Sequence, residues 1–362
     1  MVHFDQAPFE SLLRSIVYLN WMCHPSLPRQ LANVRLFFHA HTARNVIAFT
    51  QGGGKLPGWH VLPAGKASRC AAAATPINES HAGSSATFHS ACDASLAEAE
   101  RVILFFHGVG GCRGGWGLPA AAPSGRVSCK RALATHFNCH VVCFEYRGFG
   151  DATDYGTSIA PVPSEQTISE DATAAWEWLV SRVGPNCKVV FYAQSLGCAV
   201  AVRLASELMQ PKSTCARRLG LVLDAPFTSL IAAAAAHPFG QFAARMLGLV
   251  GFNSTQRAAV IAAVFARLSD SWENEQRIAA LAQGGVALLL ICKAEDEVVP
   301  SSMPRELNRL ASLGRAGSSL LASPAPRLAV IAGRSKVMKR HHVDACTTPE
   351  WLVAVGDFMD EL

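Results

Sequence analysis

Ser195 lies in a sequence pattern that can present a serine hydroxyl for nucleophilic chemistry. A run of β-branched and aromatic residues (189–192) leads into Ala193-Gln-Ser195-Leu-Gly197, and an alanine-rich helical segment follows. In such a strand–turn–helix, a serine is held on a sharp turn with its hydroxyl exposed. Small residues at 193 and 197 suit the close approach of strand and helix, although glycine is usual at the first position. The short motif alone is weak, but its strand and helix context makes Ser195 the candidate nucleophile.

A serine nucleophile needs a base, an acid that orients the base, and donors for the oxyanion. In the order Ser…Asp/Glu…His, these groups follow successive strands at the carboxyl end of the sheet. Glu295, Asp296 and Glu297 follow a predicted strand at 286–292. We predict that Asp296 is the acid, because a short turn at Val299 can return the chain towards the site. We expect Glu295 and Glu297 to be solvated loop charges.

The candidate bases are two adjacent histidines. His341 and His342 follow a predicted strand at 328–332 and precede the last predicted helix. Most histidines in a chain have structural or surface roles, but a histidine behind this strand is in the position of a general base. Position alone leaves both histidines open.

The predicted oxyanion donors are two backbone amides. One is the N–H of Leu196, and the other is the N–H of Val109 in the glycine-rich loop 107–111. The competing interpretation of this loop is phosphate binding. However, the loop lacks the Lys-Ser/Thr pair of a P-loop and the G-x-G-x-x-G spacing of a dinucleotide site, so we favour the oxyanion role.

Strand-like and helical segments alternate from residue 102 onward, which predicts an α/β fold with a mostly parallel, doubly wound sheet. Three closely spaced N-terminal strands predict an antiparallel start to that sheet. Hydrophobic periodicity places strands at 34–40, 44–50, 58–63, 102–106, 141–145, 188–192, 220–225, 286–292 and 328–332, and helices at 129–137, 166–182, 196–209, 275–283, 303–312 and 349–361.

The simplest organisation is one domain, 1–362, with three departures from the strand–helix alternation. Residues 64–98 are rich in Ala, Ser, Thr and Gly, and we expect a low-complexity surface insertion that is largely disordered. Residues 313–326 resemble a shorter insertion. Residues 229–274 are rich in Ala and Phe and predict a helical cap, in which Phe227 at the entrance could line an acyl pocket or simply belong to the core.

Composition narrows the function classes. The net charge of +5 is spread along the chain without a Lys/Arg block, so nucleic-acid binding has no support. The twelve cysteines form no C-x-x-C pair or zinc-spaced array, so we expect no metal and no cofactor, and we expect Cys143, Cys198 and Cys292 to be small buried residues. No apolar run is long enough to span a membrane, and the first residues do not read as a secretory signal.

Two further segments are predicted to be structural. Residues 145–151 have the character of a buried turn in which Arg147 pairs with a nearby carboxylate. Residues 224–228 end the predicted strand at 220–225 and lead the chain into the cap.

Taken in order, these segments resemble the α/β-hydrolase superfamily. Within it they are most similar to the alpha/beta-hydrolase domain-containing protein 12 group of monoacylglycerol and lysophosphatidylserine lipases. The resemblance covers about 56–63 and 102–361 without the insertions. His342 lies seven residues before Pro349-Glu350, which favours it over His341. The segments that carry the likeness are Gly58-Trp59-His60-Val61-Leu62-Pro63, His107-Gly108, Arg113-Gly114-Gly115, His140 to Asp151, Ala225 to Ser229, His237-Pro238-Phe239, Ala294-Glu295-Asp296 and Val299-Pro300.

The resemblance implies a serine esterase that cleaves single-chain lipid esters with the triad Ser195, Asp296 and His342. It also implies a cap that shelters the acyl chain and can touch a membrane surface. Three features depart from the group: no membrane anchor precedes the core, Ala193 replaces a glycine, and one residue is missing between Asp296 and Val299.

The location of the protein has only weak signals. The group acts at the endoplasmic reticulum, and the chain ends in Met-Asp-Glu-Leu, close to a retrieval tetrapeptide; an acidic end to an amphipathic helix is the alternative. Two acceptor sequons begin at Asn78 and Asn253. The cytoplasm is the alternative location.

Two other functions remain open. A peptidase or thioesterase could use the same scaffold, because a fold does not determine the leaving group. A binding protein that keeps the fold without turnover is the other alternative.

Overall fold

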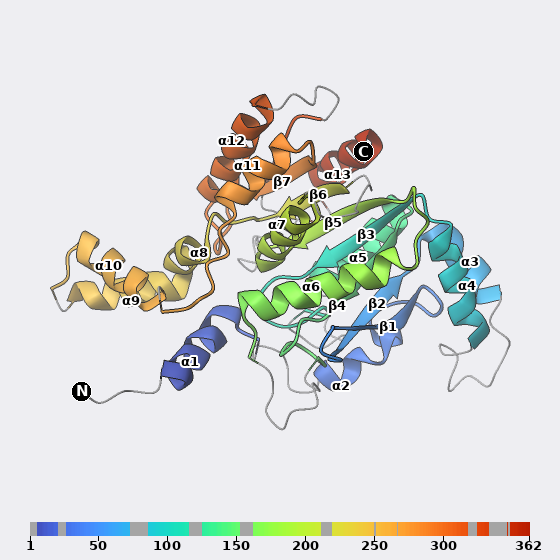
Figure 1. Ribbon diagram of the computed structural model, residues 1–362, viewed down its shortest axis with the longest axis horizontal. Helices are drawn as coiled ribbons and strands as arrows, with labels where there is room; N and C mark the ends of the chain where they lie inside the picture. The colour runs from blue at the N-terminus through green and yellow to red at the C-terminus, as the bar shows by residue number, and fades with distance from the viewer. Residues whose placement is uncertain are drawn as a thin grey trace.

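The structure is a computed structural model, and it describes residues 6–20, 27–72, 86–115, 125–152, 162–210, 219–249, 251–265, 267–317, 324–332, 346 and 348–362. A twisted eight-stranded sheet runs through its centre, in the order β1-β2-β4-β3-β5-β6-β7-β8 (Figure 1). The strands are β1 (Ala43–Phe49), β2 (Lys55–Val61), β3 (Arg101–Phe106), β4 (His140–Phe144), β5 (Lys188–Gln194), β6 (Leu219–Asp224), β7 (Ala287–Lys293) and β8 (Arg327–Ile331).

The pairing confirms the predicted fold class. β1 with β2 and β2 with β4 are antiparallel, and every pair from β4 to β8 is parallel. Strands β3 to β7 are almost continuously buried, as expected for a parallel sheet that helices cover on both faces.

One predicted strand is wrong. Within 34–40 the chain forms a short 3₁₀ helix, η1 (Val34–Leu36), followed by turns. Phe37 and Phe38 pack on the Trp59 ring with centroid separations of 4.7 and 5.3 Å. The apolar run that suggested a strand is therefore buried by aromatic packing, without a place in the sheet.

Helices cover both faces of the sheet. Helices α6, α7 and α11 contribute to the core beside Leu104 and Phe191, whereas α5 and α13 pack on the opposite face beside Phe105 and Tyr192. The helices are α1 (Gln6–Tyr18), α2 (Leu27–Leu31), α3 (Ala64–Ala72), α4 (Ala86–Ala97), α5 (Gly125–His136), α6 (Glu165–Val180), α7 (Leu196–Leu208), α8 (Leu230–Ala236), α9 (Pro238–Leu249), α10 (Ser254–Phe265), α11 (Glu275–Gln283), α12 (Ser302–Ala316) and α13 (Pro349–Glu361).

The expected disorder of residues 64–98 is wrong for the part that the structure describes. This part forms α3 and α4, which lie at the edge of the molecule away from the cap (Figure 1). Phe88, Cys92 and Leu96 are buried at a spacing of four residues. Such spacing places them on one face of a helix, a signal that the Ala- and Ser-rich composition hid.

The region expected to be a cap contains α8, α9 and α10, and the last two project from the body on the same side as α1 (Figure 1). Part of the expected insertion at 313–326 is the end of α12, and residues 318–323 lie outside the described residues.

The smaller structural predictions are confirmed. Cys143, Cys198 and Cys292 are buried, and Arg147 pairs with Asp171 at 2.7 Å.

Candidate active site

Ser195 occupies the sharp turn between β5 and α7. Its backbone angles are φ 52° and ψ −117°, which a residue with a side chain rarely adopts. Gly197 explains why the turn is so tight: a Cβ at that position would lie 2.2 Å from the carbonyl oxygen of Phe106 on β3. The strain at Ser195 is held in place by the buried strand and helix on either side, a pattern that clusters at functional sites.

Ser195 opens into a small apolar cavity of about 100 Å³. Four of the residues predicted from sequence meet there: Ser195, Leu196, Val109 and Phe227. The remaining lining comes mainly from α1, α8 and α10 and from the loop after β7, with Ile16, Val17, Leu19, Leu230, Ala233, Ala234, His237, Phe265, Val298 and Val299.

The loop after β3 lies directly against the nucleophile. A Cβ at Gly108 would be 3.1 Å from the Ser195 Cβ, so only glycine allows this approach without a shift. Leu196 is the first residue of α7. Its N–H therefore belongs to the first turn, where helix N–H groups have no partner within the helix and the helix dipole favours negative charge.

Asp296 lies in the loop that follows β7, at the carboxyl end of the sheet. Its Oδ1 atom accepts hydrogen bonds from the backbone N–H groups of Val298 and Val299, both at 2.8 Å. These two valines line the cavity with Ser195. Glu295 is exposed, as expected, whereas Glu297 is half-buried, with its Oε2 atom buried and its side chain still partly exposed.

His341 and His342 lie outside the described residues. Cys346, four residues after His342, is described and buried. Its Sγ atom lies 3.7 Å from the side-chain nitrogen of Gln194, the residue next to the nucleophile, and 3.7 Å from the Gly125 carbonyl.

Comparison with known proteins gives the family. Residues 103–346, about two thirds of the chain, match the alpha/beta hydrolase family. The chain belongs to the alpha/beta hydrolase family. The match begins within β3 and ends at Cys346, so it contains the nucleophile turn, the loop after β3 and the loop after β7.

Among curated proteins, the chain is similar to lysophosphatidylserine lipase ABHD12. The protein from Macaca fascicularis is 30% identical over 221 residues, which are 61% of this chain and 48% of that protein. The protein from Danio rerio is 29% identical over 257 residues, which are 70% of this chain and 55% of that protein. The chain thus spans about half the length of these relatives, and the expected resemblance is confirmed.

Solved structures show the same fold at low sequence identity. The esterase Pf2001 of Pyrococcus furiosus has a TM-score of 0.51 at 16% identity, covering 88% of this chain and 91% of its own. Carboxyl esterase 2 of Tuber melanosporum has a TM-score of 0.50 at 14% identity, covering 94% and 99%.

In this alpha/beta hydrolase, a buried ion pair that the sequence analysis missed lies beneath the nucleophile turn. Lys293 Nζ at the end of β7 is 3.0 Å from Asp224 Oδ1 at the end of β6. Burial lowers the pKa of Lys293, but Asp224, together with the nearby Cys346 and Asp296, outweighs burial and the net pKa is raised. The Asp224 carbonyl accepts the Ser195 N–H at 2.9 Å. The sequence did carry a signal for this ion pair, because an aspartate ends one apolar strand and a lysine ends the next one.

A second charged cluster supports the loop after β3. Glu145, just after β4, lies 2.8 Å from His107 Nε2 and 2.9 Å from the Arg113 guanidinium, and it accepts the Arg113 N–H. Burial raises the pKa of Glu145, but His107 and Arg113 outweigh it and bring the pKa to about 2. The carboxylate is therefore charged at neutral pH and holds both ends of the loop 107–113.

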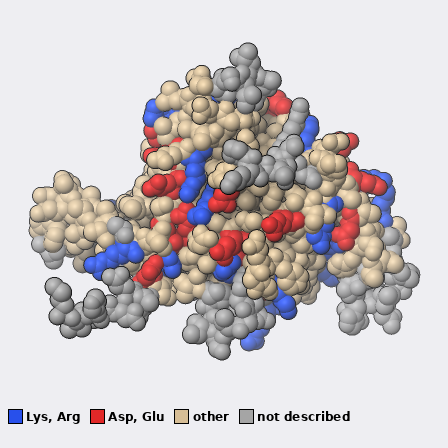
Figure 2. All heavy atoms as spheres, viewed as in Figure 1, with Lys and Arg blue, Asp and Glu red and all other residues tan. Residues whose placement is uncertain are grey.

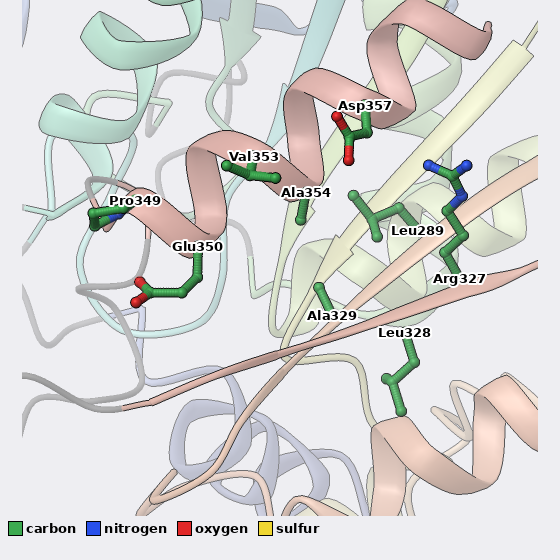
Figure 3. Close-up of a pocket in the computed structure, with 9 residues that line it drawn as sticks. All are labelled: Leu289, Arg327, Leu328, Ala329, Pro349, Glu350, Val353, Ala354 and Asp357. Carbon is green, nitrogen blue, oxygen red and sulfur yellow. The ribbon is translucent and has the colours of Figure 1, made fainter.

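A larger cavity, about 670 Å³, lies between α13 and β8 (Figure 3). It is lined by Leu289, Arg327, Leu328, Ala329, Pro349, Glu350, Val353, Ala354 and Asp357. None of these residues is a serine, cysteine or histidine, so the lining offers no serine or cysteine nucleophile and no histidine base. The candidate serine nucleophile, Ser195, lies in the small cavity instead.

Two general findings apply to the part of the chain that the structure describes. No cluster of His, Cys, Asp and Glu in it has the grouping that a metal ion requires. Within the same part, none of the helices has both the length and the apolar character of a membrane span.

Proposed function

We propose that this alpha/beta hydrolase cleaves the carboxylic ester of single-chain lipids, such as monoacylglycerol or a lysophospholipid, through an acyl-enzyme. The observation that carries the proposal is a strained serine, Ser195, that opens into an apolar cavity from the turn between β5 and α7. Such a turn exposes the hydroxyl for attack, and apolar walls suit an acyl chain.

In the proposed mechanism, Ser195 Oγ attacks the ester carbonyl while His342 takes its proton. Asp296 orients the imidazole, and the amides of Val109 and Leu196 stabilise the oxyanion. The imidazolium then gives its proton to the leaving alcohol as the C–O bond breaks. Water, deprotonated by the same imidazole, attacks the acyl-enzyme and releases the fatty acid. Neutral histidine is the working base, so activity should rise with pH through about 6.5, the ordinary histidine pKa.

The fixed orientation of Asp296 supports its role as the acid. Two backbone N–H groups hold Oδ1, so the carboxylate cannot rotate freely in its loop. An acid must hold the imidazole in one orientation and one tautomer, and a carboxylate anchored in this way can do so.

The position of Cys346 supports a histidine base from the preceding segment. Four residues of chain span at most about 14 Å. A residue at 342 is therefore within chain reach of Gln194, which Cys346 contacts and which adjoins Ser195.

The walls of the cavity support a single acyl chain as substrate. Ile16 and Val17 from α1, Leu230 from α8, Phe265 from α10 and Phe227 from the turn after β6 present apolar side chains around Ser195. We assign Phe227 to the acyl pocket. The small volume of the cavity favours one narrow chain over a bulky acyl group.

We further propose that the cap touches an anionic membrane surface. Met246, Leu249 and Phe252 are exposed, and Leu12 and Ile16 are exposed on α1. The printed sequence from 229 to 269 has three arginines and no aspartate or glutamate. Figure 2 shows the projecting cap as a surface almost without charged side chains. Exposed apolar residues with basic charge nearby are the character of a surface that lies at a lipid interface.

Vesicle binding tests the membrane contact. Leu249→Ser should weaken sedimentation with phosphatidylserine-containing vesicles, whereas Leu313→Ser, which changes a similarly exposed leucine on α12, should not. Equal binding by both variants, or binding that does not differ between anionic and neutral vesicles, would remove the proposed contact.

A substrate panel tests the reaction. Purified wild type and Ser195→Ala are compared on monoacylglycerol, lysophospholipid, acyl-thioester and aminoacyl-amide substrates. We expect hydrolysis of the lipid esters and a loss of at least 10³-fold in Ser195→Ala. Preference for the thioester or the amide would favour a thioesterase or peptidase, and no Ser195-dependent turnover would favour a binding protein.

Separate histidine variants test the base. His342→Ala should lose activity and His341→Ala should retain it; the reverse result would assign His341.

The structure bears on the retrieval tetrapeptide at the C-terminus. Met359 and Leu362 are buried, and Glu361 pairs with Arg327. These residues pack as the end of α13, which favours the helix-end interpretation over a displayed signal. The location in the cell stays a prediction.

A further inference from the structure

We propose that Arg126 on α5 is a positioning residue that aims the Val109 N–H at the oxyanion, and that the carbonyl of Tyr18 on α1 completes a clamp on the same loop. This inference rests on the proposed hydrolytic function, and it adds two residues from distant parts of the chain that no sequence motif singled out.

Arg126 binds the loop after β3 through several carbonyls. Its Nη2 donates to the carbonyl oxygens of Gly108 at 3.0 Å and Val109 at 2.6 Å, and its Nη1 donates to that of Cys112 at 2.8 Å. The side chain is buried. Hydrogen bonds from a charged donor are roughly twice as strong as neutral ones, so this guanidinium fixes the orientation of consecutive peptide groups.

The orientation of the Val109 N–H follows from peptide geometry. A trans peptide is planar, so its C=O and N–H point in opposite directions; the described residues contain no cis peptide bond. The Gly108 carbonyl points to Arg126. The N–H of Val109, in the same peptide group, therefore points away from Arg126. Val109 lines the cavity with Ser195, and an amide directed this way can meet an oxyanion formed there.

The next peptide group is held from both sides. Its carbonyl, from Val109, accepts from Arg126, and its N–H, from Gly110, donates to the Tyr18 carbonyl at 3.2 Å. Tyr18 is itself anchored, because its hydroxyl donates to Asp270 at 3.0 Å and accepts from Trp272 Nε1 at 3.0 Å. Helix α1 thus supplies a cavity wall and also fixes the loop after β3.

The clamp has a consequence for catalysis. Donors that already point to where negative charge develops need no reorganisation during the reaction. The Arg126 charge also polarises the Gly108–Val109 peptide, which makes its N–H a better donor to an oxyanion than to the neutral ester carbonyl. Loss of the clamp should therefore reduce the stabilisation of the transition state more than it reduces the affinity for substrate.

The test compares Arg126→Lys and Arg126→Met with Arg131→Met. Arg131 lies on the same helix and bonds to the Phe37 carbonyl, outside the cavity at Ser195. We expect kcat to fall about 10- to 100-fold in the Arg126 variants with KM within twofold, somewhat less than the loss of an oxyanion donor itself. The control should stay within twofold of wild type.

A trifluoromethyl ketone separates positioning from folding. This inhibitor forms an oxyanion adduct with a serine nucleophile, so its Ki should rise in the Arg126 variants by the factor by which kcat/KM falls. A merely structural role would reduce the fraction of active protein and leave Ki unchanged.

Tyr18→Phe provides a second variant if the Arg126 variants fold poorly. It removes the hydroxyl bonds to Asp270 and Trp272, and we expect a three- to tenfold loss of kcat with a parallel rise in Ki. Unchanged Ki in the folded variants would overturn the proposal. A wild-type protein that neither hydrolyses esters nor binds the ketone would instead contradict the proposed function itself.

Discussion

Strand β4 begins at one buried titratable group and ends beside another, and the two ends are built differently. At its start, His140 Nδ1 lies 2.8 Å from His60 Nε2, and Arg44 donates to His60 Nδ1 at 3.0 Å. Just past its end, Glu145 bonds to Arg113. Burial, followed by positive neighbours, lowers the pKa of His60 well below its ordinary value and that of His140 to about 4. The first end holds neutral imidazoles, whereas the second holds a charged carboxylate and guanidinium beside the imidazole of His107, whose pKa is lowered by burial.

The difference follows from what each end must do. The carboxyl ends of the parallel strands carry loops that must be held in one conformation near Ser195, and fixed charges give directional bonds to those loops. The amino end joins α4 to the sheet, through Ser95 and Asp93. Neutral imidazoles are sufficient there, but they make the attachment sensitive to acid.

Glu145→Gln should give the largest effect, because it removes the charged partner of the buried His107 and one of the two carboxylates, with Asp151, that hold the buried Arg113 guanidinium. We expect a loss of about 3–5 kcal/mol in the free energy of unfolding, measured by urea denaturation at pH 7. Glu170→Gln is the matched control, since Glu170 is an exposed partner of Arg147; its loss should be below about 1 kcal/mol. Similar losses in both would contradict the special role of the carboxyl end.

Acid should weaken the amino end first. Between pH 6.5 and about 4 the unfolded chain binds a proton at His140 that the folded protein does not, so stability falls as pH falls. His140 alone should contribute about 3 kcal/mol, fully present above pH 6.5 and lost towards pH 4. Glu145 also stabilises the fold less as the pH falls, but over a lower pH range. Its contribution to stability is present above pH 4.5 and is lost as the pH falls towards 2.

The measurement is the pH dependence of urea unfolding in wild type and His140→Gln. The slope of the free energy of unfolding against pH reports how many more protons the unfolded chain binds than the folded protein. In the variant this difference should be about one proton smaller than in wild type between pH 6.5 and 4, and the same as in wild type below pH 4. An unchanged slope in the upper window would show that His140 does not control the acid response.

Ser95→Ala should give the smallest effect. Ser95 Oγ lies 3.3 Å from His140 Nε2 and ends the chain of imidazole contacts. Removing it should cost about 1 kcal/mol of stability, whereas Ser312→Ala, at an exposed serine on α12, should change thermal unfolding little. If Ser95→Ala lost more stability than Glu145→Gln, the amino end of β4 would matter more for stability than the carboxyl end, which contradicts the comparison.

The elements that could be predicted from the sequence are those whose buried residues follow a simple strand or helix pattern. The apolar runs that became β3 to β8 were placed within one or two residues, and the helices at 275–283 and 349–361 match in full. The turn at Ser195 was recognisable because strand, small residues and helix are consecutive in the chain. Its meeting with Val109 and Phe227 followed from the rule that sites gather at the carboxyl ends of strands.

The missed features depend on contacts between distant residues. Helix α1 owes its place to Tyr18 and Arg14, which bind Asp270 more than 250 positions away. The contacts of Arg126 with the loop after β3, and of Lys293 with Asp224, likewise join segments that no local pattern connects. Helix α4 was missed for another reason, because its low-complexity composition outweighed the four-residue spacing of its apolar side chains.

Covalent labelling tests the central assignment most directly. Wild type and Ser195→Ala are treated with a fluorophosphonate, digested, and the modified residue is found by peptide mass spectrometry. We predict a single adduct on Ser195 in the wild type and none in Ser195→Ala, with both proteins folded by circular dichroism. An adduct at another residue, or equal labelling of the two proteins, would contradict the role of Ser195 as the nucleophile.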